Sequence, residues 1–169
     1  MWYIILMEYD LVDLKDNFQK KGTEEDSIKN QLFIRCVHIL LVNSLDEIMI
    51  CKRSSNKKKY PNKFTSSAGG HVEQGESYKI AAIRELKEEL NISTPLKDLG
   101  RFDVITPKER AIHHLFIGKV DKEISADPYE IASYSFLSPK NIKNDVILHP
   151  SKYAKPFREA FKHYLKFIK

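Results

Sequence analysis

The sequence predicts one α/β (α+β) domain over residues 1–169, built from mixed strands and a few helices. Two segments carry this prediction. Residues 32–42 (LFIRCVHILLV) form an aliphatic and β-branched run that is typical of a long buried strand. Residues 76–90 instead repeat apolar side chains at spacings of three and four, which is typical of an amphipathic helix. Strands and helices within one chain of this length favour a single mixed domain.

The elements of the first half are a strand pair and a basic loop. We expect a leading strand within residues 2–14, where apolar residues come first and acidic residues follow. The strand over residues 32–42 is followed by the turn Asn43-Ser44-Leu45-Asp46 and a second strand over residues 47–52, which is the pattern of a hairpin. Residues 53–63 (RSSNKKKYPNK) show no apolar period and are predicted to be a loop.

The second half adds helices and three further strands. In the helix over residues 76–90, we expect Ile80, Ile83, Leu86 and Leu90 to form the buried face and Asn91 to end the helix. Strands are predicted at residues 102–105, 112–120 and 133–137, with an acidic loop at 126–130. Ser138-Pro139 is a helix start. A last helix over residues 155–169 is predicted to pack its apolar side chains on the sheet: Phe157, Phe161, Tyr164 and Ile168.

The composition is that of a folded protein with a modest basic excess. Hydrophobic residues make up 42% and charged residues 30% of the chain, which excludes disorder as its main state. The 28 basic and 23 acidic residues give a net charge of +5, which suits an anionic partner. Residues 2–7 are far too few for a membrane span, which needs roughly 20 residues, and lack the basic start of a secretory signal. With Cys36 and Cys51 in strand-like runs as buried thiols, we expect a cytoplasmic protein without a membrane partner.

Three carboxylates on the helix point to a cation. Glu85, Glu88 and Glu89 are spaced i, i+3 and i+4, so they project from one helix face and repel one another. A hard divalent cation such as Mg²⁺ offsets this repulsion and prefers carboxylate and phosphate oxygens. Gly69 and Gly70 precede the helix, where they allow a close backbone approach and offer carbonyl oxygens to the metal. We expect Arg84 to hold Glu76 or Glu85 in place.

These residues resemble the Nudix box, G-x5-E-x7-R-E-U-x-E-E-x-G-U, where U is a bulky aliphatic residue. The match comprises Gly70, Glu76, Arg84, Glu85, Leu86, Glu88, Glu89 and Ile92, and Asn91 replaces the last glycine. The resemblance implies a Nudix fold, a mixed sheet sandwiched between helices. It also implies an Mg²⁺- or Mn²⁺-dependent hydrolase that cleaves a diphosphate linkage in a nucleoside diphosphate derivative or a related metabolite. Glu85, Glu88 and Glu89 are then metal ligands, and one of them or a Glu outside the box activates the attacking water.

Residues 52–71 resemble a particular branch, that of isopentenyl-diphosphate isomerase and its hydrolase relatives. The isomerase places a reactive Cys just before the Gly-His pair, where this chain has Gly69, and a catalytic Glu where this chain has Ala111. Cys36 and Cys51 are out of register for that role, and His38 alone stands in the first strand. Without the thiol and the carboxylate we expect no isomerase activity.

Several other residues are candidates for the site. His71 either approaches the metal or a phosphate or packs over the helix, and at most one of His113 and His114 faces the site because successive strand residues point to opposite faces. Glu109 and Glu130 are candidates for orienting the water. In the basic loop, Arg53 and Lys63 are candidates for phosphate or ribose contacts. The remaining candidates are aromatic residues that stack on a base: Tyr60, Phe64 and Tyr129.

The partner predicted for this chain is a small-molecule diphosphate. The lysine cluster at 57–59 lacks the interleaved aromatic residues of a nucleic-acid platform, so the sequence disfavours nucleic acid. We expect a monomer or a homodimer. A non-catalytic Nudix domain that senses a nucleotide or metabolite is the alternative from another functional class, and metal-dependent turnover distinguishes the two.

Overall fold

The computed structural model describes residues 7–168, so residues 2–6 of the strand expected within residues 2–14 lie outside the described residues, and a strand is present at Tyr9–Val12. Within that range the elements are β1 (Tyr9–Val12), β2 (Phe18–Gly22), α1 (Glu24–Lys29), β3 (Ile34–Val42), β4 (Ile48–Arg53), β5 (Phe64–Thr65), β6 (Ala68–His71), α2 (Tyr78–Leu90), β7 (Leu96–Thr106), β8 (Glu109–Lys119), β9 (Ile131–Leu137), α3 (Pro139–Leu148), a 3₁₀ turn (Pro150–Lys152) and α4 (Lys155–Tyr164).

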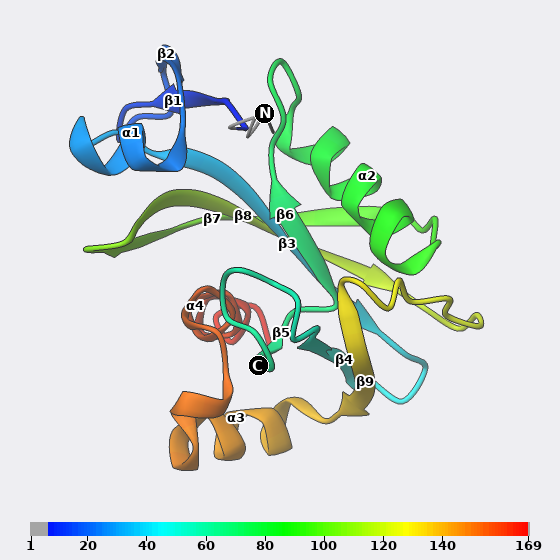
Figure 1. The fold of residues 1–169 in the computed structure, drawn as a ribbon. Coiled ribbons are helices and arrows are strands. Elements are labelled where there is room, and N and C mark those ends of the chain that lie inside the picture. The colour runs from blue at the N-terminus through cyan, green and yellow to red at the C-terminus, as the bar shows by residue number, and fades with distance from the viewer. Residues whose placement is uncertain (1–6, 169) are drawn as a thin grey trace.

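A mixed sheet forms the centre of the molecule (Figure 1). Its strands follow the order β5-β4-β3-β8-β7, with β6 paired to β3 and β9 paired to β4. The pair β3–β8 is parallel, in continuous register from Ile34 opposite Ala111 to Val42 opposite Lys119, and the other pairs are antiparallel. β1 and β2 form a separate two-stranded sheet.

The sheet forks beside β3. One edge of β3 pairs with β8, and the other pairs first with β6, from Cys36 to Ile39, and then with β4, at Val42. β6 and β4 therefore occupy the same edge of β3 at successive positions, and the strands β4, β5 and β9 separate from β3 and β6 toward one end (Figure 1).

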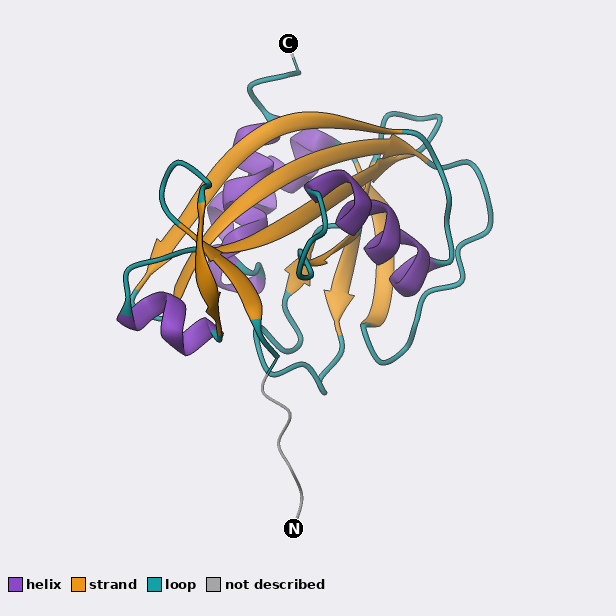
Figure 2. Ribbon diagram, turned by 90° about the horizontal axis from the view of Figure 1, so that it is seen from above, coloured by secondary structure: helices purple, strands orange, loops and turns teal. Residues whose placement is uncertain are grey.

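Helices cover both faces of the sheet (Figure 2). Alternate β3 residues supply the two cores: Val37, Ile39 and Leu41 pack in the cluster under α2, whereas Leu40 packs in the cluster with α4. Phe157, Phe161 and Tyr164 of α4 are buried there, as the sequence predicts, but the helix ends at Tyr164 and Ile168 is 37% exposed. The predicted fold class, a mixed sheet between helices, is confirmed.

The prediction of the buried face of α2 is correct for two of its four residues. Leu86 and Leu90 are buried, but Ile80 and Ile83 are 57% and 47% exposed. Ala81 and Ala82 lie against the sheet instead, because small side chains let the first turns of the helix approach the strands closely. The predicted end of α2 is confirmed, since Asn91 adopts the left-handed conformation with φ of 53°.

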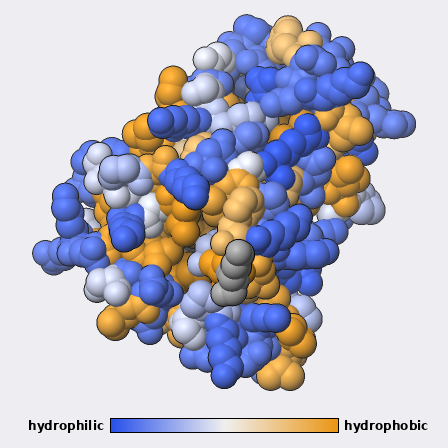
Figure 3. Space-filling model, turned by 180° about the vertical axis from the view of Figure 1, so that it is seen from behind, coloured by the Kyte–Doolittle hydropathy of each residue, from blue (hydrophilic) through white to orange (hydrophobic). Residues whose placement is uncertain are grey.

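Other boundaries shift by several residues. β7 and β8 are longer than predicted because they pair with each other along an antiparallel ladder, which is interrupted by a register shift between Asp98 and Arg101. β2, α1, β5 and β6 are short elements that the sequence analysis does not predict. The helix after Ser138 is confirmed, with the Ser138 hydroxyl accepting from the backbone N–H of Asn141. Exposed apolar side chains are scattered, and the face seen from behind mixes hydrophobic and hydrophilic areas (Figure 3). No helix among residues 7–168 is long and apolar enough to cross a membrane.

Candidate active site

A cavity of about 500 Å³ lies at the fork of the sheet. Its wall includes residues of β3, β4, β6, β8 and α2, of the loops after β4 and before β9, and of the start of α4. Of the predicted site residues, those that line the cavity are Arg53, Gly69, His71, Arg84, Glu85, Glu88, Glu89, Glu109 and Glu130. The fold thus gathers residues from four separate stretches of the chain around one space.

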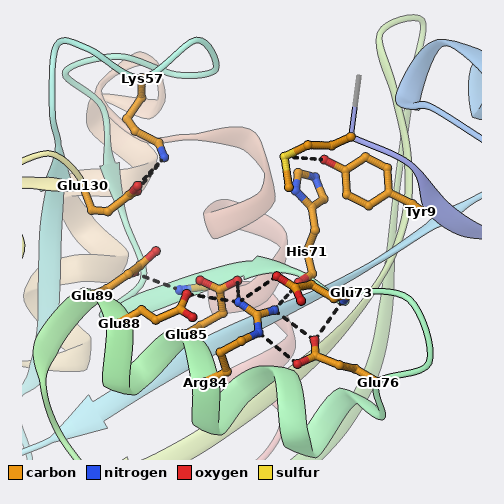
Figure 4. Close-up of polar contacts among 12 residues, drawn as sticks. Tyr9, Lys57, His71, Glu73, Glu76, Arg84, Glu85, Glu88, Glu89 and Glu130 are labelled. Atoms are coloured by element: carbon orange, nitrogen blue, oxygen red, sulfur yellow. Dashed lines mark hydrogen bonds and ion pairs between the residues drawn. The ribbon is translucent and has the colours of Figure 1, made fainter. Parts of the chain in front are cut away.

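Arg84 is the hub of the acidic cluster (Figure 4). Its guanidinium binds Glu76 through two parallel contacts, Nε to Oε1 at 2.9 Å and Nη2 to Oε2 at 3.0 Å. Nη1 donates to Glu85 Oε1 at 2.8 Å and to Glu88 Oε2 at 3.2 Å, and Nη2 also donates to the carbonyl of His71 at 2.9 Å. Arg84 therefore fixes both the loop before α2 and the carboxylates on it, as the sequence predicts for Glu76 and Glu85.

Glu89 is buried and Glu85 is largely buried, and both carboxylates accept few hydrogen bonds. Burial raises the pKa of Glu85 against the opposing effect of Arg84. Burial, with repulsion from Glu85 and Glu130, raises the pKa of Glu89 well above its ordinary value. The Gly69 N–H donates to Glu89 Oε2 at 3.3 Å, which is a long contact. This pair of acids has less positive charge and fewer donors around it than two carboxylates need.

The two glycines before α2 leave room for this cluster. A Cβ at Gly70 would collide with the carboxylate of Glu85, lying 2.7 Å from its Oε2. A Cβ at Gly69 would lie 2.6 Å from the carbonyl oxygen of Val37, so this backbone leaves no space for a larger residue there. Gly69 and Gly70 are thus required by close approach, and neither has a positive φ.

Two lysines and a histidine at the cavity contact acidic residues, and Figure 4 shows one of these pairs, Lys57 with Glu130. Lys57 Nζ donates to Glu130 Oε1 at 2.8 Å. Lys59 and His71 both contact Glu24 of α1, at 2.5 Å and 3.1 Å, and the His71 hydrogen bond is the main cause that lowers the Glu24 pKa to about 2. His71 also packs on Tyr9, with ring centroids 4.7 Å apart. His71 therefore lies in the wall, held by α1.

Some predicted residues lie outside the cavity. Lys63 donates to the carbonyl of Ser151 at 2.5 Å and does not line the cavity. Phe64 and Tyr129 do not line it either, whereas Tyr60 does and donates to Glu109 Oε2 at 2.9 Å. Sequence reasoning missed Glu24, although a signal for α1 exists in the Thr23–Asp26 capping box.

The histidines and thiols have definite places. His113 is buried and His114 is partly exposed, stacked on Tyr78 at 4.0 Å, so the two face opposite sides as predicted. Cys36 and Cys51 are buried and free, which confirms the buried thiols, and both line the cavity. In the ladder Cys36 lies opposite His71, and His38 lies opposite Gly69. Burial raises the pKa of both thiols, so both stay protonated near pH 7.

Comparison with known proteins identifies the family. The NUDIX domain matches residues 32–161, so the chain belongs to the Nudix family. A prenyl-diphosphate phosphatase from Methanosarcina mazei is 28% identical over 153 residues, covering 88% of this chain and 89% of that protein. An isopentenyl-diphosphate Delta-isomerase from Nocardia farcinica is 27% identical, covering 70% of this chain and 71% of that protein. The resemblance to the isomerase branch is thereby confirmed.

Solved structures show the same fold. A crystal structure of a Deinococcus radiodurans protein matches with a TM-score of 0.74 and 26% identity, covering 88% of this chain and 92% of that chain. A MutT protein from Methanosarcina mazei matches with a TM-score of 0.69 and 25% identity, covering 81% and 96%.

Proposed function

We propose that this chain is a Mg²⁺-dependent hydrolase that cleaves the diphosphate linkage of a nucleoside diphosphate derivative or a related phosphorylated metabolite. The observation that carries the proposal is that the α2 carboxylates and the cations of the loop after β4 line one cavity. A divalent metal ion would neutralise the carboxylates, and the basic side chains of the loop would face the phosphate oxygens that the metal leaves free.

The residues fit such a metal in kind. Glu89 is buried and Glu85 is largely buried, burial raises the pKa of both, and a bound cation would stabilise their charged forms. Among residues 7–168, however, no three acidic, His or Cys side chains converge at ligating distance, because Glu85 and Glu88 both contact Arg84. The Glu88 side chain is 59% exposed, so it can leave Arg84 without disturbing packing. Glu85, Glu88, Glu89 and the Gly69 carbonyl would hold the ion.

The chemistry then divides between ion and protein. When bound, Mg²⁺ neutralises charge on the diphosphate oxygens and lowers the pKa of a bound water. The chain orients the groups: Arg84 fixes Glu85, and Arg53, whose Nε donates to the carbonyl of Lys59 at 3.1 Å, presents its remaining guanidinium N–H groups for bidentate contact with phosphate. Glu85, Glu88 and Glu130 are our candidates for orienting or deprotonating the water. Glu130 would take this role by releasing its contact with Lys57 and accepting a hydrogen bond from the water instead.

The names of the relatives add prenyl diphosphates to the substrates that this proposal must consider. The Methanosarcina mazei relative is named for prenyl diphosphates, which share the diphosphate but carry a hydrocarbon. Isomerisation is disfavoured here because Gly69 offers no thiol and Ala111 no carboxylate, and the buried Cys36 and Cys51 stay protonated. A sensor that binds without turnover does not require three crowded carboxylates.

Phosphate release over a substrate panel tests the proposal. The panel contains nucleoside diphosphates and triphosphates, nucleotide sugars, dinucleotides and isopentenyl diphosphate, each with Mg²⁺, Mn²⁺ or EDTA. Glu89→Gln is compared with Glu123→Gln, an exposed acid outside the cavity. We expect turnover that requires metal, is lost in Glu89→Gln and persists in Glu123→Gln. Saturable nucleotide binding without turnover on any substrate would instead identify a sensor.

A further inference from the structure

Two histidines on neighbouring strands form part of the cavity wall that the proposed chemistry does not use. His38 lies on β3 and His113 on β8, with ring centroids 5.1 Å apart. His113 stacks on Phe102 at 4.9 Å with an interplanar angle of 11°, and Phe102 contacts His163 of α4. Both histidines line the cavity from the face of the sheet that α4 covers.

His113 has no hydrogen-bond partner. The residue is 2% exposed, and neither Nδ1 nor Nε2 contacts a donor or acceptor. A neutral imidazole carries one N–H donor and one acceptor nitrogen, and leaving such a group buried and unpaired costs about 1–3 kcal/mol. Unpaired buried groups are rare and call for an explanation. A phenylalanine would fill the same stack without this cost, so packing alone does not explain a histidine at this position.

His38 is arranged to meet a ligand beside His113. Its Nδ1 lies 2.6 Å from the hydroxyl oxygen of Ser66, which fixes the ring and leaves Nε2 for another partner. Burial lowers the pKa of His113 well below its ordinary value, so this ring is uncharged near pH 7. An uncharged imidazole suits an uncharged partner, while Arg53 and the Glu85–Glu89 cluster serve the diphosphate.

We infer that His38 and His113 form a hydrogen-bonding subsite for an uncharged polar group, a hydroxyl or a base edge, on the part of the substrate beyond its diphosphate. The inference rests on the proposed function and narrows its substrate class to diphosphates of a sugar or nucleoside. A hydrocarbon chain could not pair these ring nitrogens. The cavity of about 500 Å³ falls in the size range of small-molecule sites.

Binding of two analogues that resist hydrolysis tests the subsite. Methylenediphosphonate reaches only the metal end of the cavity, whereas α,β-methylene-ADP also carries a ribose and a base. Calorimetric titration with Mg²⁺ compares wild type, His113→Phe and the control His114→Phe, whose histidine lies on the opposite face of β8. We expect His113→Phe to weaken α,β-methylene-ADP about tenfold, the loss of one or two hydrogen bonds, with methylenediphosphonate unchanged. We expect His114→Phe to change neither.

Stability and spectroscopy complete the test. His113→Phe should unfold at the same temperature as wild type or higher, because it removes an unpaired buried group and keeps the stack on Phe102. In unmodified protein with ¹⁵N-labelled histidine, α,β-methylene-ADP should shift the ring resonances of His113 and methylenediphosphonate should not, which needs no variant to fold.

Three results overturn the inference. Wild type that binds α,β-methylene-ADP no more tightly than methylenediphosphonate has no such subsite, although the hydrolase stands. If His113→Phe binds α,β-methylene-ADP as tightly as wild type or more tightly, His113 makes no hydrogen bond to the ligand and this wall acts only as an apolar surface. If wild type binds neither analogue in Mg²⁺, the proposed function fails and the subsite fails with it.

Discussion

Replacing Gly70 by alanine tests whether the space against β6 positions the acidic cluster. The φ of Gly70 is not positive, so alanine is compatible with the backbone, but its Cβ would overlap the Glu85 carboxylate, 2.7 Å from Oε2. Glu85 must swing away and lose its 2.8 Å contact with Arg84. A charge-assisted hydrogen bond contributes about 1.5–3 kcal/mol. Rehydration of a carboxylate whose pKa burial raises offsets part of this loss, so we expect a net destabilisation of about 1 kcal/mol.

Activity should fall much further than stability. Displacing a positioned group by about 1 Å costs roughly 100-fold in rate, whereas about 1 kcal/mol lowers the melting temperature by only about 2–4 °C in a domain of this size. The assay is Mg²⁺-dependent phosphate release on the best substrate of the panel, with thermal unfolding measured on the same samples.

A second glycine provides the matched control. A Cβ at Gly118 would meet the side chains of Thr94 and Leu96 at 2.8 and 2.9 Å, away from the cavity. Gly118→Ala should therefore lose stability to a similar extent and keep its activity. Our account of the acidic cluster is refuted if Gly70→Ala is folded and retains more than half of the wild-type rate.

Three further predictions concern charge. Arg84→Lys should lose about 2 kcal/mol in urea unfolding and most of its activity, since lysine cannot form the paired contacts with Glu76; wild-type stability would contradict this. The pKa of Glu24 falls from 4.5 to about 2, so its carboxylate stabilises the fold fully above pH 4.5 and loses this effect toward pH 2. Glu24→Gln should therefore lower the free energy of unfolding by about 2 kcal/mol at pH 7 and leave it unchanged near pH 2. Unfolding measured as a function of pH tests this prediction. Burial raises the pKa of Glu89, so its charged carboxylate destabilises the metal-free fold above pH 4.5. Glu89→Gln should therefore melt about 2–4 °C higher than wild type in EDTA at pH 8, and Mg²⁺ should raise its melting temperature less than it raises that of wild type. Equal melting temperatures in EDTA and equal increases with Mg²⁺ would contradict this prediction.

What the sequence predicts well is local. α2 and its contact between Arg84 and Glu85 follow from spacing along one helix, and the Nudix resemblance adds the loop with Gly70 and Glu76. The β3 strand is equally clear because its apolar run is long enough to be buried on both faces. Such features depend on residues within about 20 positions of each other.

What the sequence does not predict is pairing at a distance. Glu24 reaches His71, and His38 reaches His113, only because β3 pairs with β6 on one edge and with β8 on the other. Periodicity also fails where small residues take the buried positions, as Ala81 and Ala82 do in place of Ile80 and Ile83. Local composition predicts neither these long-range contacts nor the buried alanines, because each depends on how closely two elements approach.

The fork beside β3 separates the buried frame of this protein from a loop that adds further contacts to the cavity. The parallel β3–β8 ladder and the two cores on its faces lie behind the fork, whereas the loop after β4 contributes to the cavity from the other branch. Residues 54–63 can therefore change in length or charge without altering a buried ladder. This arrangement makes the protein evolvable: new specificities can arise in the loop while the catalytic helix and its frame are inherited intact, and loop grafting should succeed in the laboratory for the same reason.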